Sequence, residues 1–69
     1  MAKFNDCTPG ASATITRSDV VRVVGKTGVI VEASRAKRGK TESMVERITI
    51  DIPGHGEIVV TPPDLELLP

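Results

Sequence analysis

The sequence predicts a single small all-β domain, a closed or nearly closed barrel of about five antiparallel strands. Valine and isoleucine supply most of the apolar side chains, and β-branched side chains pack well on pleated sheets. Apolar and polar residues alternate in several short runs, which is the period of a half-buried strand. Glycine and proline separate these runs at short intervals, as turns do in small barrels.

Length, charge and cysteine content limit the number of domains and the classes of function that the chain can have. The chain has 69 residues, 39% of them hydrophobic, which suffices for one small core. We expect residues 1–10 to form a flexible lead-in and residues 11–69 to form the domain. Nine basic and nine acidic residues cancel, so no net charge attracts nucleic acid or membrane. A single cysteine, Cys7, with no export signal and no long apolar run, indicates a cytoplasmic protein.

The first predicted strand lies within residues 11–17, where Ala13 and Ile15 share the inner face. Residues 18–24 are ambiguous, because their valines occur at both helical and strand spacing. A loop containing one helical turn and a short irregular strand both fit this segment.

The clearest strand begins after Gly28. Its alternation places Val29, Val31 and Ala33 on one face, which we predict to be the inner face. The polar residues 35–43 follow and predict an exposed loop between two strands.

Residues 44–52 carry the strongest alternation in the chain, with three isoleucines on one face. A tight turn is expected at 53–56, and residues 57–61 return as a strand. Pro62 and Pro63 lack backbone donors and end the ladder, after which residues 64–68 form a turn and a short last strand. The predicted core comprises Ile15, Val29, Val31, Ile48, Ile50, Ile52, Ile58, Val60, Leu65 and Leu67.

Two segments resemble a known family. Gly25 and Gly28, followed by an apolar strand, resemble the Gly-x-x-Gly-x-Val segment of KOW-type domains within the SH3-like barrels. The closing residues 62–68 are similar to the tight helical turn and final strand of such barrels. The resemblance implies an SH3-like barrel of about five antiparallel strands, in which the first glycine permits a turn and the second lets the strand begin close to its neighbour.

The residue inventory argues against an enzyme. Gly25-Lys26-Thr27 and Gly39-Lys40-Thr41 lack the upstream glycine of a phosphate-binding loop. Cys7 and the single histidine, His55, provide neither a metal-ligand set nor a nucleophilic triad. We therefore expect no catalytic residues, no metal and no cofactor. Without tryptophan or tyrosine, the aromatic groove that binds proline-rich peptides cannot form.

One basic cluster remains, formed by Arg35, Lys37, Arg38 and Lys40 in the predicted loop. We expect a non-enzymatic accessory or protein-interaction module of a cytoplasmic complex, which contacts an unidentified protein through this loop and a sheet edge. Val59, which alternation turns outward, is the candidate for an exposed apolar spot. The alternative is a KOW-like RNA- or DNA-binding module that uses residues 35–40. A loop that is merely solvated is equally an open interpretation of the cluster, and an enzyme ranks behind the two binding functions.

Overall fold

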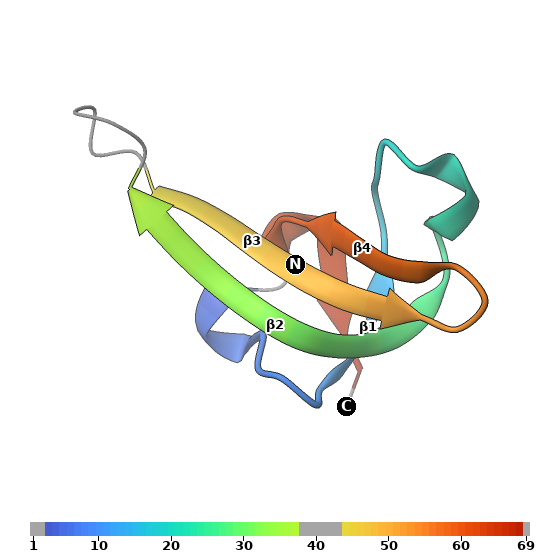
Figure 1. The fold of residues 1–69 in the computed structure, drawn as a ribbon, viewed down its shortest axis with the longest axis horizontal. Coiled ribbons are helices and arrows are strands. Elements are labelled where there is room, and N and C mark those ends of the chain that lie inside the picture. Colours follow the sequence, from blue (N-terminus) through green and yellow to red (C-terminus); the bar gives the residue numbers. More distant parts are fainter. Residues whose placement is uncertain (1–2, 38–43, 69) are drawn as a thin grey trace.

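Five antiparallel strands form one sheet in the order β4-β3-β2-β1-β5 (Figure 1). The computed structural model describes residues 3–37 and 44–68. The elements are the 3-10 turns η1 (Phe4–Asp6), η2 (Val21–Val23) and η4 (Pro62–Asp64), and the strands β1 (Ser12–Ile15), β2 (Thr27–Lys37), β3 (Met44–Ile52), β4 (Gly56–Val60) and β5 (Leu65–Leu67). The prediction of an all-β domain with five antiparallel strands is confirmed.

The strand order follows from a simple path. Strands β1 to β4 pair in succession, and η4 then returns the chain so that β5 pairs with the outer side of β1. The long β2–β3 hairpin runs along the molecule, and one end of it projects beyond the other strands (Figure 1). Of residues 18–24, Val21–Val23 form the single 3-10 turn of η2, as the loop interpretation expects.

The core is built mainly from the inner face of β3. Ile48, Ile50 and Ile52 are buried, as their alternation predicts, and Ile15 and Leu65 cover them from β1 and β5. Ile58 and Leu67 are half-buried and pack against the same cluster. Four further core residues were not in the predicted core set, namely Cys7, Ala13, Val23 and Ile30.

The predicted facing of β2 was wrong. Ile30 is buried, whereas Val29 and Val31 are 44% and 42% exposed. The register explains the error, because Ile30 pairs with Ile50 and Glu32 pairs with Thr49, which leaves one extra residue in β2. Such a bulge interrupts the alternation of faces. Strict alternation through Ala33 therefore assigns Val29 and Val31 to the inner face, although they lie on the outer one.

Beyond the bulge the inner face resumes at Ala33, which packs against the core as predicted. The predicted loop 35–43 was also too long at its start. Strand β2 continues to Lys37, where it pairs with Met44 of β3. Residues 35–37 are therefore strand residues.

The N-terminal segment packs onto the sheet. Cys7 is 2% exposed, and Phe4 lies partly buried against the core. The backbone N–H of Gly10 donates to the carbonyl oxygen of Ile30 over 2.8 Å. The flexibility of residues 1–10 stays a prediction, but Phe4 and Cys7 contribute to the folded domain.

Two glycines position the start of β2. Gly25 has a φ of 85°, a conformation that side chains other than glycine adopt with strain. Gly28 has ordinary φ but lies against β3, where an added Cβ would overlap the backbone oxygen of Asp51. The first glycine therefore serves the turn and the second serves the close approach of two strands.

Candidate binding surface

Arg35, the first member of the predicted basic cluster, is engaged by its own domain. Its Nη2 lies 2.8 Å and its Nε 3.0 Å from Oε2 of Glu46, the residue opposite it on β3. Its guanidinium also lies over the ring of Phe4, 4.4 Å from the centroid. Arg35 thus ties the N-terminal turn η1 to the β2–β3 hairpin.

The remaining members of the predicted cluster are Lys37, Arg38 and Lys40. Lys37 is the last residue of β2. Arg38 and Lys40 lie outside the described residues. The predicted binding role of this cluster stays a prediction.

A groove on the surface is a better-defined candidate for a binding site than the basic cluster. It has a volume of about 710 Å³ and opens where three segments distant in sequence meet. One wall is the loop after β1, a second is the start of β3, and the third is the end of β4 with η4. The groove is lined by Arg17, Ser18, Asp19, Val20, Val45, Glu46, Arg47, Val59, Val60, Thr61 and Asp64.

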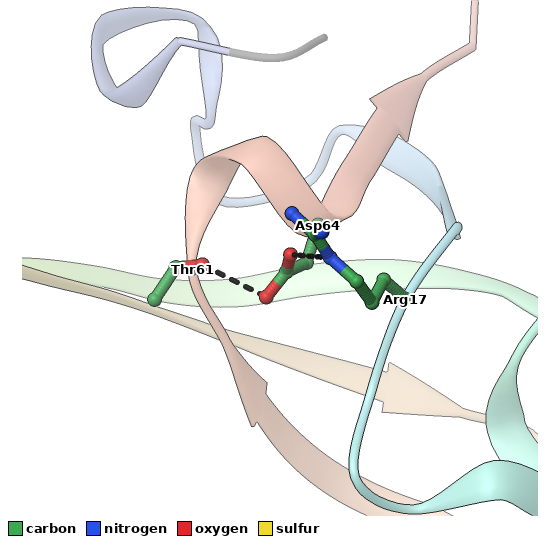
Figure 2. Close-up of polar contacts among 3 residues, drawn as sticks. All are labelled: Arg17, Thr61 and Asp64. Atoms are coloured by element: carbon green, nitrogen blue, oxygen red, sulfur yellow. Dashed lines mark hydrogen bonds and ion pairs between the residues drawn. The ribbon is translucent and has the colours of Figure 1, made fainter.

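Asp64 joins two walls of this groove (Figure 2). Its Oδ1 accepts from Nε of Arg17 over 3.0 Å, and its Oδ2 accepts from the hydroxyl of Thr61 over 2.9 Å. Its backbone oxygen accepts from the N–H of Thr16 over 2.8 Å. The Thr61 hydrogen bond, and then the Arg17 guanidinium, hold the pKa of Asp64 below its ordinary value. The loop after β1 is thereby fastened to η4.

Valines provide the apolar part of the groove. Val60 is buried, Val20 and Val45 are half-buried, and Val59 is 59% exposed. The prediction that Val59 is an exposed apolar residue is confirmed. The groove also carries charges of both signs, with Arg17 and Arg47 among three carboxylates.

Cys7 and His55, which the sequence offers as reactive side chains, do not line the groove. No cluster of three or more potential metal ligands occurs in the ranges 3–37 and 44–68, and no polar or charged side chain is buried there. Burial raises the pKa of the Cys7 thiol, so the nucleophilic thiolate is disfavoured. His55 lies in the turn between β3 and β4, whereas the groove lies at the opposite ends of these strands.

Sequence reasoning missed the groove because no local motif encodes it. Its walls come from segments around residues 17–20, 45–47 and 59–64, which only the strand order brings together. The available signals were the outward-facing Val59 and the Pro62-Pro63 pair, which indicates that the chain turns there.

Comparison with known proteins adds no assignment. The chain matches no protein family model, no curated protein sequence and no solved structure. Within the described residues, no helix has the length and apolar character needed to cross a membrane.

Proposed function

We propose that this chain is a non-enzymatic protein-interaction module, and that a protein partner occupies the groove between the loop after β1, the start of β3 and η4. The observation that carries the proposal is the composition of the groove. Apolar side chains, foremost Val59, stand beside charges of both signs, which is the mixture found at protein interfaces with an apolar centre and polar rim.

The same composition argues against nucleic acid in the groove. Three carboxylates, those of Asp19, Glu46 and Asp64, line it beside two arginines. Modules that bind nucleic acid combine positive charge with aromatic side chains on which bases stack. The only aromatic residue of the chain is Phe4, and the guanidinium of Arg35 covers its ring.

Two features support the further proposal that the fold is an SH3-like barrel. The order β4-β3-β2-β1-β5 returns the last strand to the first, and the 3-10 turn η4 leads directly into β5. The buried Cys7 thiol fits a reducing compartment such as the cytoplasm.

Site-specific photo-crosslinking in the native cell tests the proposal. A photoreactive residue in place of Val59 should capture one distinct protein, whereas the same residue at Leu68, which is 45% exposed outside the groove, should not. The Asp19→Lys variant should weaken capture from position 59 without altering the circular dichroism spectrum. Equal capture from both positions, or capture of RNA in place of protein, would contradict the proposal.

A further inference from the structure

The outer edge of β4 is open. Strand β4 stands at one end of the strand order, and within the described part of the chain no backbone hydrogen bond reaches its outer side. Alternate residues of an edge strand direct their N–H and C=O groups away from the sheet, where they can pair with another strand.

The edge carries one charged side chain, Glu57, and little other protection against such pairing. Its pairing with β3 runs from Gly56 to Val60 without a register shift, and the strand contains no lysine and no proline. The opposite edge of the sheet, β5, has only three residues. Residues Val59 and Val60 belong both to the edge strand and to the groove, so a strand placed along β4 would continue into the groove.

The charges on the edge indicate which side chains an added strand would carry. Glu57 lies directly opposite Asp51 of β3, and both side chains are exposed. Like charges in such a pair destabilise a sheet, and neither carboxylate forms an ion pair with a basic group among the described residues. A basic side chain on an added strand, opposite Glu57, would relieve this repulsion.

We propose that β4 accepts an extended partner segment as a sixth, antiparallel strand, with Lys or Arg opposite Glu57 and apolar residues opposite Ile58 and Val59. Read from its N-terminus, that segment carries two apolar residues followed by a basic one. Ile58 is half-buried, so an apolar neighbour would extend the core. This inference rests on the proposed function and specifies the partner of the same surface.

A second copy of this chain fits the edge less well. Two antiparallel β4 strands centred on Ile58 would place Glu57 of each copy opposite Val59 of the other. The Glu57 and Asp51 carboxylates of both copies would then share one exposed face, and the repulsion would double without any added cation.

Selection from a displayed library of random decapeptides tests the inference. The selected peptides should share the apolar-apolar-basic order, and N-methylation of alternate backbone nitrogens should weaken their binding at least about tenfold, because each edge hydrogen bond would be lost. The Glu57→Lys variant should bind these peptides at least about tenfold more weakly, since the pair opposite it becomes repulsive. Glu66→Lys makes the same charge change on β5 and should leave their affinity within about twofold, because β5 lies at the other edge.

The outcomes separate this inference from the function on which it rests. Peptides that lose affinity in Asp19→Lys, yet ignore Glu57→Lys and N-methylation, would overturn strand addition and leave the groove as the binding site. A library that yields no binder would overturn both. A peptide-free protein that sediments as a dimer, and dissociates when β4 is altered, would assign the edge to a second copy and overturn the inference.

Discussion

Replacing Gly28 by alanine tests the packing of β2 against β3. The added Cβ would overlap the backbone oxygen of Asp51 and would lie 2.7 Å from Cδ1 of Ile52 and 2.9 Å from the backbone carbon of Asp51. The isoleucine side chain can rotate away, but the backbone of Asp51 is held in the ladder by pairing with Val29 and Glu57. The substitution must therefore displace one strand from the other.

Overpacking of a close-fitting core costs about 1–3 kcal/mol, and contact with backbone places Gly28→Ala at the upper end, about 3 kcal/mol. In a domain of this size about 1 kcal/mol lowers Tm by roughly 4–8 °C, so Gly28→Ala should lower Tm by roughly 12–24 °C. Thermal unfolding followed by far-ultraviolet circular dichroism measures the change.

The matched control is Gly25→Ala. Gly25 has a φ of 85° and open space where a Cβ would be placed, so the cost is that of the left-handed conformation alone, about 1–2 kcal/mol. Gly28→Ala should therefore be the more destabilising of the two. A Gly28→Ala protein with a Tm within about 4 °C of the wild type would refute the close approach of β2 and β3 at this residue.

Three further predictions follow from named contacts. The Cys7 thiol, buried and with a raised pKa, should react with a thiol reagent at pH 8 far more slowly in the native protein than in urea, and equal rates would contradict its burial. The pKa of Asp64 is lowered on folding, so its stabilising contribution is complete above the unfolded value of about 3.9 and is lost as pH falls through the lower folded value. Urea unfolding of Asp64→Asn should accordingly show a smaller loss of stability between pH 5 and pH 2 than the wild type. Arg35→Ala, which removes the contacts with both Phe4 and Glu46, should destabilise the domain by about 0.5–1.5 kcal/mol in urea unfolding, whereas Arg47→Ala, on the exposed side of β3, should change it by less than about 0.5 kcal/mol.

Periodicity predicted the fold wherever a strand is regular and has one buried face. The isoleucines of β3 alternate without interruption and are all buried, and Gly25 before β2 and Gly28 within it have the roles expected of them. The same reasoning failed in β2, because the bulge near Val31 is set by pairing with β3 rather than by any local residue type.

Other features depend on contacts between segments distant in sequence, and the sequence alone could not predict them. Arg35 belongs by composition to a basic loop, yet Glu46 and Phe4 bind it within the fold. Cys7 lies in a polar segment whose burial depends on the sheet beneath it. The groove depends on η4 and the loop after β1 being joined by Asp64, 47 residues from Arg17.

Amide hydrogen exchange of the protein alone and with its crosslinked partner tests the central claim most directly. If the partner occupies the groove and the edge of β4, residues 57–61 and 17–20 should gain protection while β5 stays unchanged. Protection that appears in residues 35–37, with residues 17–20 and β4 unaffected, would assign binding to the end of the β2–β3 hairpin and contradict the account.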